Sequence, residues 1–197
     1  MFSGIIQDIG KLKNFKSNEI LINTSLDLSD CKIGSSIACN GVCLTAISIQ
    51  KLDHNNYNFS AELSEETILK TNFSHNNFSN YINIEKSLKV GDEISGHFVY
   101  GHVDCVTEII KINKLESSWN FEFKINNNNK IMKKFVVKKG SIAINGISLT
   151  IAETTSKSFS ISIVPHTYEN TNLKYAKEKD LVNVEFDALA RYMVNND

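Results

Sequence analysis

The chain has 197 residues and a formal net charge of −1, from 21 basic and 22 acidic side chains. This near-neutral balance excludes the cationic stripe of a nucleic-acid surface, and the apolar runs are too short for a membrane span or a secretion signal. We therefore expect a soluble cytoplasmic protein that binds neither nucleic acid nor membrane.

Alternation of apolar and polar residues predicts antiparallel β-strands along most of the chain. We expect strands at residues 35–48, 58–63, 81–85, 119–125, 134–137, 158–164 and 182–186. Asn40-Gly41 and Asn145-Gly146 suit tight hairpin turns, because both central residues of such a turn need a positive φ. Helix signals are short: Ser64 can cap a helix, and Pro165 suits a first helical turn.

The tail, residues 188–197, predicts a short C-terminal helix over residues 188–194. Leu189, Tyr192 and Met193 would share one stripe of this helix. A helix of this length is not stable alone. We therefore expect it to dock, with an oligomer contact as the predicted role.

A long internal repeat divides the chain. Ser36-Ile-Ala-Cys-Asn-Gly-Val-Cys-Leu-Thr-Ala-Ile47 returns as Ser141-Ile-Ala-Ile-Asn-Gly-Ile-Ser-Leu-Thr-Ile-Ala152 about a hundred residues later. This period predicts two small domains, residues 1–96 with a linker at about 87–96, and residues 97–187. Because closure removes exposed sheet edges, we expect a mainly β fold of two similar six-stranded antiparallel Greek-key closed barrels, plus the short C-terminal helix.

Two histidines and two cysteines lie at positions where they could bind a metal or take part in catalysis. His97 and His102 open the second domain, and Cys39 and Cys43 flank the first hairpin turn. Together they could form a zinc site. The Cys-x₃-Cys spacing straddles a turn and the second repeat keeps neither thiol, which disfavours zinc. We expect reduced thiols at all four cysteines of the chain.

Two of the differences between the repeats bear on function. Cys43 is compatible with a buried filler or with a nucleophile or acid, but Ser148 in the same place is a poorer filler because a buried hydroxyl needs a partner. His102 stands where the first half has Ile5, which favours a functional role, whereas His97 is compatible with a structural or a functional one. Motifs for acyl, phosphoryl and hydride transfer are absent from the sequence. These residues predict a protein with two small-molecule sites.

Four motifs occur in order along the chain: Met1-Phe-Ser-Gly-Ile-Ile-Gln7, Asn40-Gly-Val-Cys-Leu-Thr45, Gly96-His-Phe-Val-Tyr-Gly-His-Val103 and Asn145-Gly-Ile-Ser-Leu-Thr150. Together they resemble the riboflavin synthases of the α type, from residue 1 to about residue 187. The resemblance implies a dismutation, in which one 6,7-dimethyl-8-ribityllumazine donates a four-carbon unit to another. The implied products are riboflavin and 5-amino-6-ribitylaminouracil.

The resemblance also carries expectations about cofactors and assembly. It implies no cofactor and no metal, because the electron-poor substrate ring acts as the electron sink. Each barrel would bind one lumazine, and the productive site would lie between the N-terminal barrel of one subunit and the C-terminal barrel of its neighbour. A homotrimer follows, with lumazine synthase as a candidate partner.

Specific residues are assigned by the same resemblance. The expected catalytic residues are Phe2, Cys43, His102, Ser148 and Thr150. The lumazine site of the N-terminal barrel would be formed by Phe2, Gly4, Ile5, Ile6, Cys43, Thr45, Glu62, Leu63, Ser64, Glu65, Glu66 and Thr67. That of the C-terminal barrel would be formed by Gly101, His102, Val103, Lys139, Ser148, Thr150, Val164, Pro165, His166 and Thr167. Further substrate-binding positions are Ser36, Leu44, His97, Leu149, Tyr168, Glu169 and Asp187.

The chain departs from the family pattern at three places. Ser3 replaces a more frequent threonine, and Asn145 stands where an acidic residue is often found. Both keep their hydrogen-bonding capacity. His166 occupies a place often given to glutamate, which changes the charge expected near the ribityl chain.

Two other functions fit a pair of small barrels. A non-catalytic lumazine- or flavin-binding antenna protein needs one bound chromophore, so one half would be free to lose its site. Both Asn-Gly boxes are complete here, which favours the enzyme. A binder of single-stranded nucleic acid would need a basic groove with stacked aromatics, which the charge and the lone Trp119 disfavour.

Overall fold

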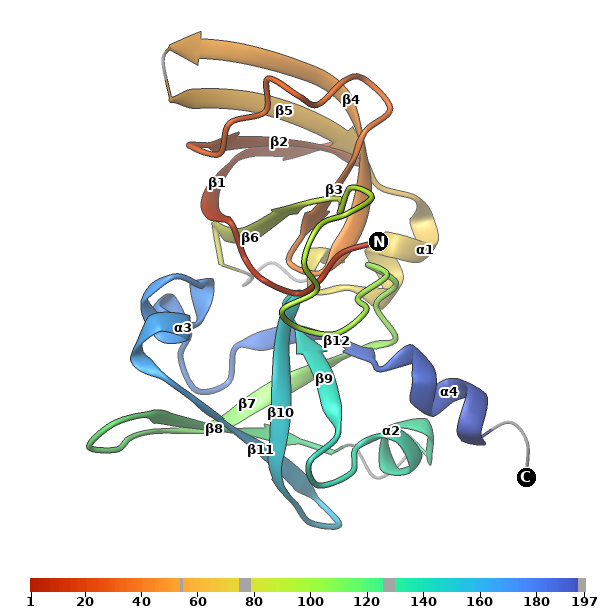
Figure 1. The fold of residues 1–197 in the computed structure, drawn as a ribbon, viewed down its shortest axis with the longest axis vertical. Helices are drawn as coiled ribbons and strands as arrows, with labels where there is room; N and C mark the ends of the chain where they lie inside the picture. Colours follow the sequence, from red (N-terminus) through yellow and green to blue (C-terminus); the bar gives the residue numbers. More distant parts are fainter. Residues whose placement is uncertain (54, 75–78, 126–129, 195–197) are drawn as a thin grey trace.

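Figure 1 shows the computed structural model of the chain, which describes residues 1–53, 55–74, 79–125 and 130–194. The first six strands close into one antiparallel barrel in the order β1-β2-β5-β4-β3-β6. Their bounds are β1 Asp8–Lys16, β2 Glu19–Thr24, β3 Ser36–Cys39, β4 Val42–Asp53, β5 Asn56–Glu62 and β6 Tyr81–Lys86.

The second barrel repeats this order as β7-β8-β11-β10-β9-β12. Its strands are β7 Cys105–Lys114, β8 Trp119–Lys124, β9 Ser141–Ile144, β10 Ile147–Thr154, β11 Ser158–Ile163 and β12 Leu181–Phe186. The predicted fold of two closed six-stranded barrels is confirmed. Both hairpin turns have the predicted backbone, with φ of 49° and 75° at Asn40 and Gly41, and 46° and 81° at Asn145 and Gly146.

Short helices lie between the strands, and three were predicted. In α1 (Glu65–Lys70), the Ser64 hydroxyl accepts a bond from the Thr67 amide, and α3 (Pro165–Glu169) begins with proline. The tail forms α4 (Ala188–Val194), whereas residues 195–197 lie outside the described part. Single 3₁₀ turns occupy Asn72–Ser74 and Asn172–Tyr175. No helix among the described residues is long and apolar enough to cross a membrane.

The predicted strand at residues 134–137 is wrong. Helix α2 (Lys130–Phe135) occupies the first half of that stretch. Met132 and Val136 lie four residues apart and are both buried in the second core, which is the period of a helix rather than of a strand. The predicted ranges omit strands β1, β2, β7, β9 and β10, although the turn between β9 and β10 was predicted. Lysines and bulges interrupt the alternation in β1 and β7.

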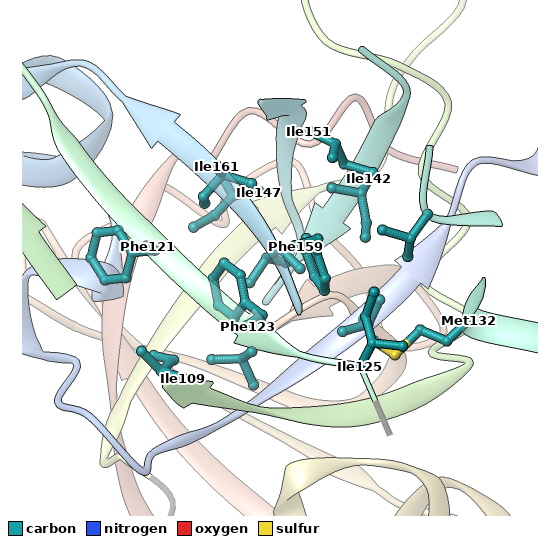
Figure 2. Packing of buried hydrophobic residues seen from close by; sticks show 14 of the residues in the cluster. Ile109, Phe121, Phe123, Ile125, Met132, Ile142, Ile147, Ile151, Phe159 and Ile161 are labelled. Carbon is teal, nitrogen blue, oxygen red and sulfur yellow. The ribbon is translucent and has the colours of Figure 1, made fainter. Parts of the chain in front are cut away.

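Each barrel encloses its own apolar core. Figure 2 shows the second one, where Phe121, Phe123 and Phe159 lie together and the rings of Phe123 and Phe159 are 5.1 Å apart. A third, small cluster of Phe2, Ala38, Val99 and Ala143 lies between the two larger cores. The two barrels therefore share a packed interface.

Buried asparagines hold this interface together. Asn83 donates to the Asn145 carbonyl at 3.0 Å, and Asn183 donates to the Asn40 carbonyl at 2.9 Å. The two hairpin turns touch, since a Cβ on Gly41 would lie 2.5 Å from the backbone nitrogen of Gly146. Each barrel thus donates a hydrogen bond to a backbone carbonyl in the hairpin turn of the other barrel. These bonds fix the relative orientation of the two barrels.

Candidate functional site

Two segments that precede the barrels cross at this interface. We name residues 1–6 the first head segment and residues 98–103 the second head segment. Phe2 and Val99 exchange backbone bonds of 2.7 and 3.0 Å, so the segments run antiparallel where they meet. Past this point, the Gly4 carbonyl accepts from the Ser148 amide at 2.8 Å, and the Gly101 carbonyl accepts from the Cys43 amide at 2.9 Å. Each head segment therefore lies on the opposite barrel.

This exchange corrects the predicted grouping of residues. Gly4 lies against Ser148 rather than Cys43, and Gly101 with His102 lies beside Cys43 rather than Ser148. The cause is the antiparallel crossing, which carries each segment past its own barrel. Sequence order alone favours the opposite pairing.

Two buried carboxylates hold the head segments in place. Glu85, on the last strand of the first barrel, accepts from the amides of Ser3 and Gly4 at 2.7 and 3.1 Å. Glu185, on the last strand of the second barrel, accepts from the amides of Tyr100, Gly101 and His102 at 2.7, 2.9 and 3.0 Å. Each barrel thus anchors its own head segment while that segment reaches across to the other barrel.

Burial raises the pKa of Glu185 to about 7, although the three amide bonds oppose this. Between about pH 4.5 and pH 7 the folded protein keeps a proton that the unfolded chain loses, so the free energy of unfolding should fall as the pH rises. The fall is at most about 1.4 kcal/mol per pH unit for one group. Urea unfolding between pH 5 and pH 8 measures this slope, and Glu185→Gln should flatten it. The exposed Glu116→Gln is the matched control, and equal slopes in the two variants would contradict the assignment.

A pocket of about 530 Å³ opens beside Cys43, between the first barrel and the second head segment. We call it the first pocket. It is lined by six of the predicted substrate-binding residues: Cys43, Glu66, Thr67, Gly101, His102 and Val103. Six lining residues were missed: Val42, Lys70, Thr71, Asp104, Phe186 and Arg191. The pocket is therefore built from both halves of the chain.

Both apolar and charged side chains line the first pocket. Val42 and Phe186 are buried and apolar, and Cys43 also lines the pocket. Among the charged residues, Lys70 pairs with Glu66 at 2.8 Å, and Arg191 pairs with Asp104 at 2.7 Å. A ligand with a flat ring and a hydroxylated chain matches both kinds of surface.

The position equivalent to Cys43 in the second barrel has a different environment, which we call the second site. Nδ1 of His97 lies 2.7 Å from the Ser148 hydroxyl. Burial lowers the pKa of His97, which favours the neutral ring, while the nearby Asp187 carboxylate opposes that shift. A Cβ on Gly96 would lie 2.8 Å from the Ser148 Cβ, so only glycine lets the linker pass here. Ser148 is thus a hydroxyl with a basic partner, as its polar character required.

A second cavity, of about 410 Å³, lies between the first head segment and α3. It contains the predicted residues Ile6, His166 and Glu169. Its other lining residues are Gln7, Asp8, Ile9, Asn170, Lys174 and Tyr175. Ile6 occupies the repeat position of Val103, which lines the first pocket, but Ser148 and His97 do not line this second cavity.

Several predicted site residues contribute to structure instead of lining either cavity. Phe2, Leu44 and Leu63 are buried in apolar clusters. Ser64 caps α1, and Tyr168 stacks on Trp119 with ring centres 4.1 Å apart. Other predicted residues outside the two cavity linings are Gly4, Ile5, Ser36, Thr45, Glu62, Glu65, Lys139, Leu149, Thr150, Val164, Pro165 and Thr167.

The structure does not support the alternative of a zinc site at Cys39 and Cys43. Cys39 is buried in the first core, where burial raises its pKa, whereas Cys43 faces the first pocket. The two thiols therefore point into different environments. Cys31, Cys39 and Cys43 are free thiols.

Comparison with known proteins agrees with the duplicated architecture. Residues 3–87 and 100–187 both match the lumazine-binding domain family. The riboflavin synthase of Brucella abortus (strain 2308) is 38% identical over 98% of this chain and 96% of its own length. Those of Photobacterium leiognathi and Bacillus subtilis (strain 168) are 39% and 32% identical over 98% of this chain, and over 87% and 88% of their own lengths.

Solved structures share the fold. LumP complexed with riboflavin gives a TM-score of 0.77 at 22% identity, covering 94% of this chain and 99% of that one. LumP complexed with 6,7-dimethyl-8-(1′-D-ribityl)lumazine gives 0.75 at 22% identity, covering 94% and 98%. At this identity the likeness concerns the fold. Together with the relatives of nearly full length, it leads to one conclusion: the chain belongs to the riboflavin synthase family and carries that family's lumazine-binding domain twice.

Proposed function

We propose that the chain binds two molecules of 6,7-dimethyl-8-ribityllumazine and dismutates them to riboflavin and 5-amino-6-ribitylaminouracil. The observation that carries this proposal is the exchange of the head segments, which gives each barrel one site built from both halves. The sites differ chemically, with a thiol at Cys43 in one and a hydroxyl paired with His97 at Ser148 in the other. Two unlike sites suit a reaction in which one copy of a substrate donates to another.

The proposed chemistry needs proximity and proton transfer. Holding two rings together replaces a bimolecular encounter, which is worth up to about 7 to 11 kcal/mol in well-oriented systems. Ser148 and His97, which share a hydrogen bond, can together take up and return a proton, and His102 at the first pocket is a second candidate acid or base. The substrate ring supplies the electron sink, so no cofactor is proposed.

We further propose a homotrimer in which the first pocket of one subunit faces the second site of its neighbour. Leu189, Tyr192 and Met193 on α4 support this, because these side chains are 65 to 76% exposed and form an apolar stripe. Free thiols at Cys31, Cys39 and Cys43 support a cytoplasmic location. Lumazine synthase, which would supply the substrate, is a candidate partner.

A non-catalytic antenna, which would bind a lumazine or a flavin without converting it, is the second candidate. An antenna does not need Ser148 held 2.7 Å from His97, nor a second complete site. The retention of both unlike sites therefore supports the enzyme.

Mixed oligomers test the proposed site directly. Thr67→Trp blocks the first pocket, and Ser148→Ala removes the hydroxyl of the second site. Each variant alone should be nearly inactive. The two variants are given different tags, co-expressed and purified through both tags. Each mixed trimer has three pairings of a first pocket with a neighbour's second site, and one of these pairings is intact. About a third of the parent activity should therefore return. Activity that stays at the level of the single variants would contradict a site shared between subunits.

A further inference from the structure

The chain contains one arginine. Its other 20 basic residues are all lysines, and Arg191 lies on α4 near the C-terminus. Arginine differs from lysine in its planar guanidinium, which holds up to five N–H donors in a fixed fork. A surface charge would be supplied equally well by lysine, as at 20 other positions here. The side chain at residue 191 therefore calls for a local explanation.

That explanation begins with Asp104. Nη2 of Arg191 lies 2.7 Å from Oδ2 of Asp104, and the same oxygen accepts from the Phe186 amide at 2.8 Å. The Asp104 side chain is 18% exposed and that of Arg191 is 37% exposed, so the pair is partly withdrawn from water. This pair is less exposed to water than other ion pairs on the surface, such as Lys138 with Glu153.

The pair also lies at a particular place. Both Arg191 and Asp104 line the first pocket, with Asp104 two residues from His102. The Asp104 bond uses Nη2, so most of the guanidinium donors are uncommitted among the residues that the structure describes. The other Asp104 oxygen, Oδ1, takes no hydrogen bond within the same described residues. The pocket wall thus presents donors and an acceptor side by side, which is the pattern that neighbouring hydroxyl groups require.

We propose that Arg191 and Asp104 form a polyol subsite of the first pocket, in which the guanidinium donates to ribityl hydroxyls of the bound lumazine. The subsite rests on the proposed function for the identity of the ligand. Helix α4 thereby contributes to ligand binding in addition to its proposed oligomer contact. The lumazine ring would lie against Cys43 and Val42 of the same pocket.

The test compares two ligands on two variants. Arg191→Gln and Arg191→Lys are made in the Ser148→Ala background, which limits turnover during titration of lumazine fluorescence. For 6,7-dimethyl-8-ribityllumazine, one of the two binding events per chain should weaken at least about tenfold in Arg191→Gln, as for the loss of a charge-assisted hydrogen bond. Arg191→Lys should recover only part of the loss, because it restores the charge without the fork. For 6,7,8-trimethyllumazine, which has no ribityl chain, the variants should bind as the parent does.

The controls separate this inference from the proposed function. Lys138→Gln removes a surface ion pair of the second barrel that does not line the first pocket, and it should leave both binding events unchanged. Equal affinities of parent and Arg191 variants for the ribityl ligand would overturn the subsite. An equal loss for the trimethyl ligand would also overturn it, since Arg191 would then only hold α4 in position. A parent that binds neither ligand would instead overturn the proposed function.

Discussion

Gly101→Ala is expected to destabilise the protein by at least about 3 kcal/mol and to abolish ligand binding at the first pocket. Gly101 has a φ of +81°, and an added Cβ would lie 2.5 Å from the Cys43 Cβ and 2.7 Å from the Cys43 nitrogen. The second head segment would have to leave the first barrel. That movement breaks the bond from the Cys43 amide and strains the three amide bonds to Glu185.

The matched control is Gly91→Ala. Gly91 has a similar φ of +97°, but nothing lies within 4 Å of the position that its Cβ would take. It therefore isolates the backbone cost, about 1 kcal/mol, from the steric one. Chemical denaturation and lumazine titration of both variants measure the difference. Equal stability losses in the two variants would show that the close contact with Cys43 is unimportant.

Ser148→Ala is expected to lower turnover by about a hundredfold or more while leaving the fold intact. The change removes the hydroxyl that lies 2.7 Å from Nδ1 of His97, and with it the proposed route for the proton. His97→Gln should give a loss of similar size, because the amide can bond to Ser148 but is not basic. The double variant should lose little more than either single variant, since the two groups act as one unit.

Steady-state riboflavin formation and thermal unfolding together measure these effects. Ser48→Ala is the matched control, because the Ser48 hydroxyl pairs with that of Ser60 at 2.6 Å, on the first barrel and away from both sites. This control should keep its turnover. Additive losses in the double variant would contradict a shared role for Ser148 and His97.

Much of the fold could be predicted from local signals. The Asn-Gly pairs fixed the hairpin turns, because few other residues tolerate two successive positive φ values. The internal repeat predicted that the two halves of the chain have the same fold. Strands such as β1 were missed because bulges break the period of two, and α2 was mistaken for a strand because four residues cannot distinguish the two periods.

The sequence predicted half of the residues that line the first pocket, and it did not predict how the site residues are grouped. Cys43 and Ser148 stood out because they break an otherwise faithful repeat. The exchange of head segments could not be deduced, since it depends on an antiparallel crossing at Phe2 and Val99 that has no local sequence signal. Arg191 was also missed, although its status as the lone arginine was visible in the sequence.

The interface asparagines are an intermediate case. Asn83 and Asn183 occupy equivalent strand positions where an apolar residue is usual, and both are 1% exposed. A repeated polar residue inside a buried strand indicates a shared hydrogen-bonding task. The sequence could have predicted that Asn83 and Asn183 form buried hydrogen bonds. Their partners, the Asn145 and Asn40 carbonyls, depend on how the two barrels pack together.

The central claim is that two unlike sites bring two identical substrates together. The most direct test incubates the purified protein with 6,7-dimethyl-8-ribityllumazine as the sole substrate, and follows lumazine, riboflavin and the pyrimidine product by chromatography. We expect repeated turnover, with one riboflavin and one 5-amino-6-ribitylaminouracil formed for every two lumazines consumed. Tight binding of lumazine without riboflavin formation would contradict it and would indicate an antenna protein.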